Sequence, residues 1–314
     1  MKKALVIGAA GFVGGYLIDC LSDEFGMQVF GTRLTSQDYQ HPKAKIFDLD
    51  ILKKGDIDAL LNDIRPDCIF HLAAQSSVGV SWKNPQLTVD INIKGALNVL
   101  DAIRGLDYKP KVLLIGSGEE YGDSGADAGK IDEETVLKPG NVYAATKACQ
   151  NMLGTIYAKA YGLDIVNVRA FNHIGPGQAE TFVVSDFCKQ VAQIEAGKME
   201  PVINVGNLGA YRDFTDVRDV VRAYAMLAQK GQSGQTYNVG SGRAVQIQTL
   251  LDKILAHSKA QIQVRVDPSK MRPIDVPKIE ADTSKIQTQI GWQPKLSVDD
   301  TIGDVLDWWR KAVR

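Results

Sequence analysis

Residues 4–14 read ALVIGAAGFVG, a short apolar run that leads into three glycines spaced Gly-x-x-Gly-x-x-Gly. The run predicts a buried strand, and the segment after the glycines has the apolar spacing of a helix. Gly8 permits a sharp turn, Gly11 lets backbone amides approach a pyrophosphate, and Gly14 allows close contact between helix and strand. Because the N-terminus of a helix attracts phosphate, the stretch predicts a dinucleotide-binding turn.

The same alternation of strand and helix continues through the first half of the chain. Such repeats require right-handed crossovers and a parallel sheet with helices on both faces. We therefore predict an α/β fold, a Rossmann-type doubly wound parallel sheet with a smaller C-terminal substrate-binding lobe. The predicted strands are 4–8, 28–32, 44–48, 68–73, 111–116 and 164–170. The predicted helices are 14–25, 55–64, 87–104, 141–161, 182–197, 216–229, 246–256 and 298–313.

After about residue 172 the pattern changes, because Gly, Pro and Asn interrupt it repeatedly. This change predicts a domain boundary and a return of the chain to the first domain further on. The predicted first domain comprises 1–170 with about 213–240, and the predicted second lobe comprises 171–212 and 241–314.

The composition is that of an ordinary globular protein, with 45% hydrophobic residues and a net charge of −1. This charge balance gives no reason to expect nucleic acid or a membrane surface as a partner. The N-terminal MKKALVI resembles a signal peptide, but the patterned glycines and the amphipathic continuation favour a folded segment. The four cysteines and four histidines are scattered, which predicts free thiols in a reducing, cytoplasmic compartment and no metal site.

The second predicted strand ends in Thr32, which Arg33 follows, at a place where an acidic residue commonly binds the adenosine ribose. A carboxylate would repel a 2′-phosphate, whereas a guanidinium can pair with one through two hydrogen bonds. NADP(H) is therefore favoured as the cofactor, with NAD(H) as the alternative, and a solvated loop position is the other interpretation of Arg33. Asp48, at the end of the third strand, either reaches the adenine amino group or caps a helix.

Tyr143 and Lys147 open a predicted helix four residues apart, so their side chains lie on one face. An adjacent ammonium is expected to stabilise the phenolate and lower the tyrosine pKa, which suits proton transfer to or from a substrate oxygen. Ser117 follows the apolar run KVLLI, at the end of a strand where doubly wound sheets place ligands. Its hydroxyl is predicted to bind the same oxygen, the alternative being a turn residue that bonds its own backbone.

Together these motifs resemble those of the extended short-chain dehydrogenase/reductases. The motifs are Gly8-x-x-Gly11-x-x-Gly14, Asp48-Leu49, Leu72-Ala73-Ala74, Ser117 with Tyr121-Gly122, and Tyr143-x-x-x-Lys147. The resemblance extends over essentially the whole chain through Arg169-Ala-Phe-Asn172, Tyr211-Arg212-Asp213-Phe214 and Arg272-Pro-x-Asp275-x-Pro277. Three longer phrases are similar to the GDP-mannose branch of that family: HLAAQSSVGVSWKNP, FNHIGPGQAETFVVSDF and VGNLGAYRDFTDVRD.

The resemblance implies NAD(P)H-dependent reduction of the 4-keto group of GDP-4-keto-6-deoxy-D-mannose to a GDP-6-deoxyhexose, GDP-D-rhamnose. It implies a homodimer formed through helices 87–104 and 144–161. The implied cofactor contacts are Gly8, Gly11, Phe12, Val13, Gly14, Thr32, Arg33, Asp48, Leu49, Leu72, Ala73, Ala74, Tyr143 and Lys147. The implied contacts to the GDP-sugar are Ser77, Asn172, Lys189, Arg212 and Arg272.

Glu119 leaves a second chemistry open. A 4-keto reductase needs a hydride, a proton from Tyr143 and Ser117 to orient the ketone, but no carboxylate base. In dehydratases of the family a glutamate two residues after the serine or threonine moves the C5 proton, and Glu119 occupies that position. Three segments depart from the dehydratase pattern, namely the turn GAAGFVG, the loop IGPGQ and the segment GTRLTSQD. The reductase is therefore the preferred interpretation, with Glu119 as a residue that bonds a sugar hydroxyl.

Three alternatives remain. One is a GDP-mannose 4,6-dehydratase or a related nucleotide-sugar dehydratase, and the next is an epimerase that oxidises and reduces C4 again. The third is a redox-inactive nucleotide-binding protein on the same fold, which the presence of both Tyr143 and Lys147 disfavours.

Overall fold

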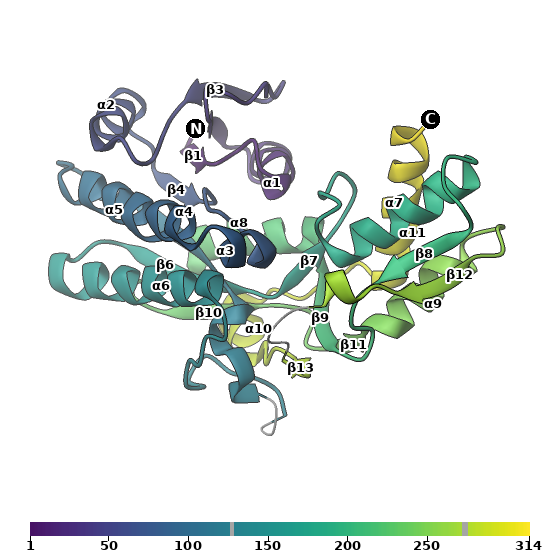
Figure 1. The fold of residues 1–314 in the computed structure, drawn as a ribbon. Coiled ribbons are helices and arrows are strands. Elements are labelled where there is room, and N and C mark those ends of the chain that lie inside the picture. Colours follow the sequence, from purple (N-terminus) through teal and green to yellow (C-terminus); the bar gives the residue numbers. More distant parts are fainter. Residues whose placement is uncertain (126–128, 272–275) are drawn as a thin grey trace.

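The computed structural model describes residues 1–125, 129–271 and 276–314. Its large sheet consists of β1 (Lys3–Ile7), β2 (Gln28–Arg33), β3 (Ala44–Asp48), β4 (Cys68–His71), β5 (Lys111–Ser117), β6 (Ile165–Ala170) and β10 (Thr236–Val239). All pairs are parallel, in the order β10-β6-β5-β4-β1-β2-β3 (Figure 1). The order reverses between β1 and β4, where doubly wound sheets bind ligands beyond the carboxyl ends of their strands.

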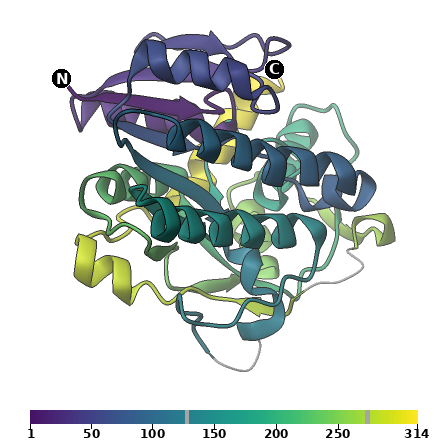
Figure 2. The same ribbon diagram turned by 90° about the vertical axis from the view of Figure 1, so that its left-hand side faces the viewer.

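Helices cover both faces of the large sheet, and each face has its own apolar core. One core contains residues of α1 (Phe12–Asp23), α8 (Val217–Lys230) and α10 (Ser284–Ile290). The other contains residues of α2 (Lys54–Ile64), α5 (Ala96–Arg104) and α6 (Val142–Tyr161). α5 and α6 lie side by side on one flank of the molecule (Figure 2).

The second lobe has a third core between α7 (Val183–Glu195), α9 (Ile247–Ala256) and α11 (Val298–Ala312). These helices pack beside a parallel pair, β8 (Val202–Val205) and β12 (Gln263–Val266). Between the lobe and the large sheet lie short strands grouped around β9 (Tyr211–Asp216), as Figure 1 shows. Its neighbours are β7 (Asn172–Ile174), β11 (Ala244–Gln246) and β13 (Lys278–Ile279).

The remaining helical segments are short. They are α3 (Val78–Lys83), α4 (Pro85–Val89), the π-helical turn η1 (Asp90–Gly95) and the 3-10 segments η2 (Gly118–Gly125) and η3 (Pro268–Lys270). Within the described ranges, no helix combines the length and the hydropathy that a bilayer span requires.

The structure confirms the predicted doubly wound sheet, and all six predicted strands belong to it. The helix predicted over 87–104 differs, because α4, η1 and α5 follow one another with a π-helical turn between them. The two-domain division stays a proposal, and its boundary needs a change. α10 and the buried Trp292 pack in the core beside α1 and α8, although the prediction placed 241–314 in the second lobe.

Candidate active site

The glycine turn between β1 and α1 lies where the strand order reverses. Gly8 has a φ of 89°, in the left-handed region that favours glycine. A Cβ atom at Gly14 would lie 2.1 Å from the carbonyl oxygen of Ala9, so this close approach of helix and strand requires glycine. Thr32 secures the turn, because its Oγ1 accepts a hydrogen bond of 3.0 Å from the Gly8 amide. The N-terminus of α1 therefore borders the cavity with its partial positive charge.

A cavity of about 610 Å³ extends from this turn along the carboxyl edge of the sheet. It brings together most of the residues that the sequence predicts for the site. The predicted residues that line it are Gly8, Gly11, Phe12, Val13, Gly14, Thr32, Arg33, Leu49, Leu72, Ala73, Ala74, Ser77, Ser117, Glu119, Tyr143, Lys147 and Asn172. Asp48, Lys189 and Arg212 are not among the described residues that line the cavity.

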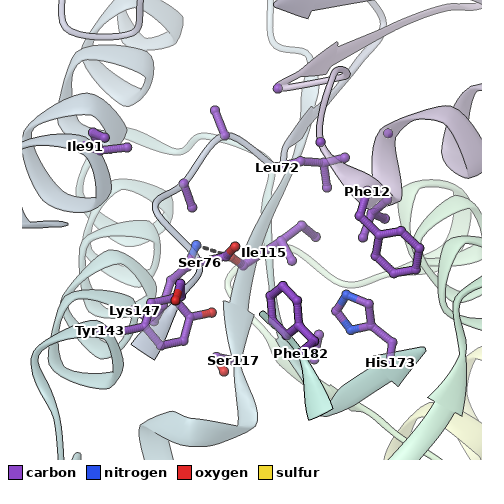
Figure 3. Close-up of a pocket in the computed structure, with 18 of the residues that line it drawn as sticks. Phe12, Leu72, Ser76, Ile91, Ile115, Ser117, Tyr143, Lys147, His173 and Phe182 are labelled. Atoms are coloured by element: carbon purple, nitrogen blue, oxygen red, sulfur yellow. Dashed lines mark hydrogen bonds between the residues drawn. The ribbon is translucent and has the colours of Figure 1, made fainter. Parts of the chain in front are cut away.

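Ser117, Tyr143 and Lys147 meet at the carboxyl end of β5 (Figure 3). Ser117 is the last residue of β5, and the other two lie one turn apart at the start of α6. All three side chains are buried, with exposed fractions of 8%, 9% and 3%. The Tyr143 and Ser117 side chains line the same part of the cavity, close enough for Ser117 to influence the pKa of Tyr143. A ketone oxygen in this part of the cavity would therefore meet two hydroxyl groups.

The pKa of Tyr143 differs from the expectation. Burial raises it above its usual value, the neighbouring Ser117 side chain acts in the opposite direction, and Glu119 and Glu120 raise it further. The predicted lowering by Lys147 is therefore wrong for this arrangement, because loss of solvent outweighs the other influences. A phenol with a raised pKa stays protonated at neutral pH, which is the form that donates a proton in a reduction.

Lys147 carries its charge in a largely dry environment. Its Nζ donates hydrogen bonds of 2.8 Å to the carbonyl oxygen of Ile115 and 3.1 Å to Oε1 of Gln150. Burial lowers its pKa to about 8, while the charge of Glu120 acts in the opposite direction. A lowered lysine pKa means that the ammonium form persists below about pH 8 and is lost as the pH rises past it.

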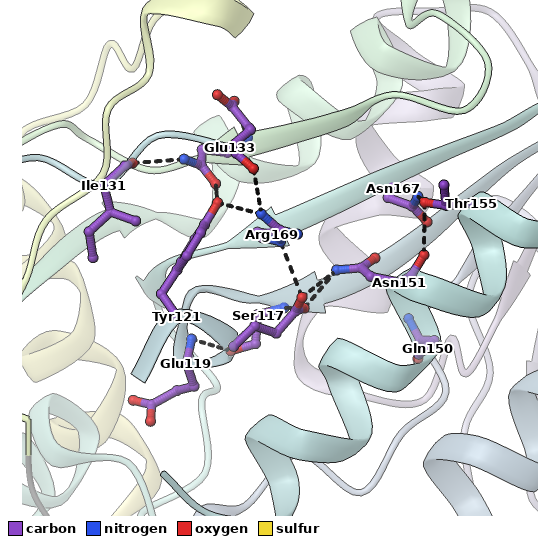
Figure 4. Close-up of polar contacts among 12 residues, drawn as sticks. Ser117, Glu119, Tyr121, Ile131, Glu133, Gln150, Asn151, Thr155, Asn167 and Arg169 are labelled. Atoms are coloured by element: carbon purple, nitrogen blue, oxygen red, sulfur yellow. Dashed lines mark hydrogen bonds and ion pairs between the residues drawn. The ribbon is translucent and has the colours of Figure 1, made fainter. Parts of the chain in front are cut away.

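Glu119 borders the same cavity at the start of η2. Its amide donates a hydrogen bond of 3.2 Å to Oγ of Ser117, and its Oε2 accepts a longer one of 3.4 Å from Asn141 Nδ2. Asn141 also caps the N-terminus of α6. Figure 4 shows the Glu119 carboxylate turned away from the buried cluster around Arg169. It is thus within reach of a bound substrate.

Arg33 ends β2 with its guanidinium held by two neighbours. Its Nε donates a hydrogen bond of 2.9 Å to Oδ1 of Asp48, and its Nη1 donates one of 3.1 Å to the carbonyl oxygen of Tyr39. Asp48 pairs with Arg33 and is not among the described residues that line the cavity, so its contact with the adenine stays a prediction. The carboxylate orients the guanidinium and offsets part of its charge.

The predicted substrate residues of the second lobe are not all brought together. Lys189 pairs with Glu180 at 2.9 Å and lies 5.5 Å from the ring of Trp309. Arg212 is buried and donates hydrogen bonds to the carbonyl oxygens of Tyr211 and Val276, at 2.8 and 2.7 Å. Their long side chains are thus directed to local partners rather than to the cavity. Arg272 lies outside the described residues.

One aromatic residue on the far side of the cavity, His173, was not predicted from the sequence. His173 stacks on Phe12, with ring centroids 6.1 Å apart and an interplanar angle of 3° (Figure 3). Burial lowers the pKa of His173, so the imidazole is neutral at pH 7, and its Nδ1 lies 3.1 Å from the carbonyl oxygen of Phe171. The only sequence signal was its place next to Asn172.

Asn92 is a second residue that the sequence did not reveal. It lies in η1 with no exposed surface. Its side chain accepts a hydrogen bond of 2.8 Å from the amide of Gln75, and it donates bonds of 3.0 Å to the Gln75 carbonyl and to Oγ1 of Thr146. The π-helical turn thus connects the segment after β4 to α6, beside Lys147.

Comparisons with known proteins give consistent relatives. A family model described as GDP-mannose 4,6 dehydratase matches residues 5–305. A GDP-6-deoxy-D-mannose reductase of Pseudomonas aeruginosa is 31% identical over 265 residues, which cover 84% of this chain and 87% of that protein.

Solved structures of related enzymes also resemble this chain over nearly its whole length. The structure of RMD from Pseudomonas aeruginosa complexed with NADPH has a TM-score of 0.87 and 28% identity, with all of both chains covered. A Thermus thermophilus UDP-glucose 4-epimerase in complex with NAD has a TM-score of 0.89 and 26% identity, over 99% of this chain and 100% of that one.

Proposed function

Because the chain belongs to the GDP-mannose 4,6-dehydratase family, we propose that it reduces the 4-keto group of GDP-4-keto-6-deoxy-D-mannose with NADPH. The product is a GDP-6-deoxyhexose, GDP-D-rhamnose. The matching family model, the similar reductase and the similar solved structure confirm the predicted resemblance to the extended short-chain dehydrogenase/reductases. The chain is accordingly an NAD(P)-dependent oxidoreductase. The preference for a reductase over a dehydratase is supported by the similarity to the reductase of Pseudomonas aeruginosa.

The residues of the cavity fit a dinucleotide. The backbone amides of the glycine turn and of the N-terminus of α1 would hold the pyrophosphate. The turn requires glycine at Gly8 and Gly14, because a Cβ atom at either position would clash with neighbouring backbone atoms. Thr32, Arg33 and Leu49 would hold the adenosine half. Bound NADPH supplies the hydride.

The proton and the orientation come from the chain itself. The hydroxyls of Ser117 and Tyr143 would bind the ketone oxygen, and Tyr143 would donate its proton to that oxygen as the alcohol forms. The Lys147 ammonium would stabilise the negative charge that develops nearby. Ser77 and Asn172, which line the cavity, are proposed to contact the sugar nucleotide.

The observation that carries this proposal is the placement of the Ser117–Tyr143 pair in the same cavity as the glycine turn. The test is an assay with purified GDP-4-keto-6-deoxymannose, in which the nicotinamide absorbance and the sugar product are followed together. The proposal expects one NADPH consumed for each ketone reduced. Conversion of GDP-mannose with no change in cofactor absorbance and with loss of water would favour the dehydratase.

Glu119 gives the sharpest test between those two chemistries. Glu119→Gln keeps an acceptor for Asn141 but removes the base. A hydrogen bond that is not essential is worth about 0.5–1.5 kcal/mol, so ketone reduction should stay within about tenfold of the unmodified rate. The kcat of the variant is measured with the keto sugar at saturating NADPH. A loss of several decades would mean that Glu119 moves a proton, as elimination requires.

Arg33 is proposed to bind the 2′-phosphate of NADPH. Arg33→Ala should weaken NADPH binding by about tenfold or more and NADH binding much less, because a charge-assisted bond is worth about 1.5–3 kcal/mol. Asp48→Asn should have the opposite effect and strengthen NADPH binding, since it removes the carboxylate that pairs with Arg33. Fluorescence titration measures the NADPH and NADH affinities of both variants. Equal losses for the two cofactors in Arg33→Ala would exclude a role in reading the phosphate.

We also propose a homodimer built on the flank formed by α3, α4 and α6, which contact one another. Large apolar side chains are exposed there: Val80, Trp82, Leu87, Val89, Met152, Ile156 and Tyr161. An exposed apolar patch of this kind is typical of an interface. Sedimentation should give twice the mass of one chain, and a monomer at micromolar concentration would refute this proposal.

The four cysteines are all free thiols. This is consistent with the proposed cytoplasmic, reducing location.

A further inference from the structure

A buried carboxylate that the proposed reaction does not use lies behind Ser117. Glu120 has no exposed surface, and its Oε1 accepts a hydrogen bond of 2.8 Å from the Ser117 amide. Nδ2 of Asn151 lies 2.7 Å from both carboxylate oxygens, and Nε of Arg169 donates to Oε2 at 3.2 Å (Figure 4). The carboxylate therefore joins β5, α6 and β6 directly behind the site.

The surrounding backbone is shaped for this carboxylate. A Cβ atom at Gly116 would lie 2.2 Å from Oε1 of Glu120 and 2.4 Å from Nδ2 of Asn151, so glycine is required there. Arg169 is held in turn, since its Nη1 donates to Oη of Tyr121 at 2.8 Å and to the carbonyl oxygen of Glu133 at 3.0 Å. Burying an ion pair costs desolvation free energy, and apolar residues often stabilise a core equally well. Stability alone therefore does not account for the pair.

The carboxylate is also coupled to Lys147. Asn151, which holds it, lies one turn beyond Lys147 on the same face of α6. Nζ of Lys147 bonds the carbonyl oxygen of Ile115, two residues before Ser117 on β5. Burial raises the pKa of Glu120, while Arg169, the hydrogen bonds from Ser117 and Asn151, and the charge of Lys147 act in the opposite direction. Burial lowers the pKa of Lys147, and the charge of Glu120 raises it.

We propose that Glu120 is a positioning residue for the reduction, which fixes Ser117 through its backbone amide and keeps the neighbouring Lys147 in the ammonium form. The inference rests on the proposed function, because Ser117 and Lys147 have their roles in that reaction. Glu120 is not among the described residues that line the cavity, so it acts through Ser117 and Lys147.

Other titratable groups near the cluster do not interfere in the neutral and basic range. Burial lowers the pKa of His71 to about 3, and it raises those of Tyr121 and Tyr143. Charged residues on α3 and η1, which pack against α6, are exposed, namely Lys83, Asp90 and Lys94. On α5, Asp101 pairs with Arg104 and accepts a hydrogen bond from Tyr157. The groups that face the cluster are His71 on β4, Glu119 and Tyr121 on η2, Glu133 after η2, Tyr143 and Lys147 on α6, and Arg169 on β6. Lys147, with its pKa of about 8, therefore sets the basic limb of the pH profile.

The test is the pH profile of Glu120→Gln between pH 5.5 and 9.5, compared with the unmodified protein. Loss of the carboxylate lets desolvation lower the lysine pKa further, so the basic limb of kcat should move toward acid by about one pH unit. The rate should consequently fall about fivefold more at pH 8 than at pH 6, and about tenfold more at pH 9.5. A uniform loss with an unchanged profile would reduce Glu120 to a structural role and overturn the proposal.

Glu133→Gln is the matched control. Glu133 is a second carboxylate of the same network, and its Oε1 accepts a hydrogen bond of 2.7 Å from the amide of Asn238. The substitution removes one charge near Arg169 but none beside Lys147. It should therefore leave the basic limb in place, and an equal shift in this control would contradict the proposal.

Two further measurements keep the inference separate from the sugar assignment and from folding. NADPH affinity is measured against pH without substrate, because Lys147 lines the cavity and its charge should contribute to that affinity. The acid-ward shift is expected there even if the keto sugar proves not to be the substrate. If Glu120→Gln does not fold, Glu120→Gln/Arg169→Met, which also removes the buried guanidinium that pairs with Glu120, is tested in the same way. An unshifted NADPH profile in the folded variant would overturn the proposal.

Discussion

Tyr143→Phe is expected to lower kcat for ketone reduction by about 10²- to 10⁴-fold, the contribution typical of a positioned proton donor. The substitution removes the hydroxyl that lies beside Ser117 in the cavity and retains the ring. NADPH affinity should stay within about threefold, because the proposed contacts to the pyrophosphate and the adenosine lie elsewhere. Steady-state kinetics and fluorescence titration measure the two quantities on the same protein.

The matched control for this result is Tyr157→Phe. Tyr157 lies on the same helix, and its hydroxyl donates a hydrogen bond of 2.8 Å to Asp101. Losing this bond should cost about 1 kcal/mol of stability and leave kcat unchanged. If Tyr143→Phe kept its rate within tenfold of the control, Tyr143 would not be the proton donor.

Gly14→Ala is expected to lower the free energy of unfolding by about 3 kcal/mol, at the upper end of the range for overpacking. The added Cβ atom would lie 2.1 Å from the carbonyl oxygen of Ala9 and 2.5 Å from its carbonyl carbon, both backbone atoms. α1 must shift away from β1 to relieve this contact. NADPH affinity should fall by about 100-fold, because the shift moves the amides that would hold the pyrophosphate.

Gly15→Ala provides the control at the next position of α1. The nearest atom to a Cβ there is Oη of Tyr39 at 3.5 Å, an ordinary contact. Alanine in a helix is favoured over glycine by about 1 kcal/mol, so this variant should be neutral or more stable. Urea denaturation and NADPH titration compare the two. Equal behaviour of the two variants would show that close packing at Gly14 does not support the cofactor site.

Much of the fold could be predicted because its signals are local. Six of the seven strands of the large sheet are short runs rich in apolar residues, and each long helix repeats apolar residues at helical spacing. The seventh strand, β10 (TYNV), lacks this signal and was not predicted. The glycines of the first turn carry their steric requirement with them, as Gly8 and Gly14 show. The pairing of Tyr143 and Lys147 on one face of a helix follows from their spacing alone.

The remainder depends on contacts between distant segments. Asp48 pairs with Arg33 from a neighbouring strand, and no local pattern shows this. The tyrosine pKa is governed by burial, which only the packed structure reveals. The bonds of Glu120 come from Asn151 on α6 and Arg169 on β6, and no local pattern shows them. The spacing of apolar residues in 87–104 predicts one continuous helix and does not indicate the π-helical turn that contains Asn92.

The most direct test of the proposed reduction uses NADPH deuterated at both C4 positions of the nicotinamide together with GDP-4-keto-6-deoxymannose. The proposed reaction predicts one deuterium at C4 of the product alcohol in every turnover, with the oxidised cofactor released in equal amount. Mass spectrometry of the GDP-sugar reads the label without reference to product stereochemistry. A converted sugar nucleotide that carries no deuterium, formed with no net oxidation of NADPH, would contradict the assignment of this chain as a reductase.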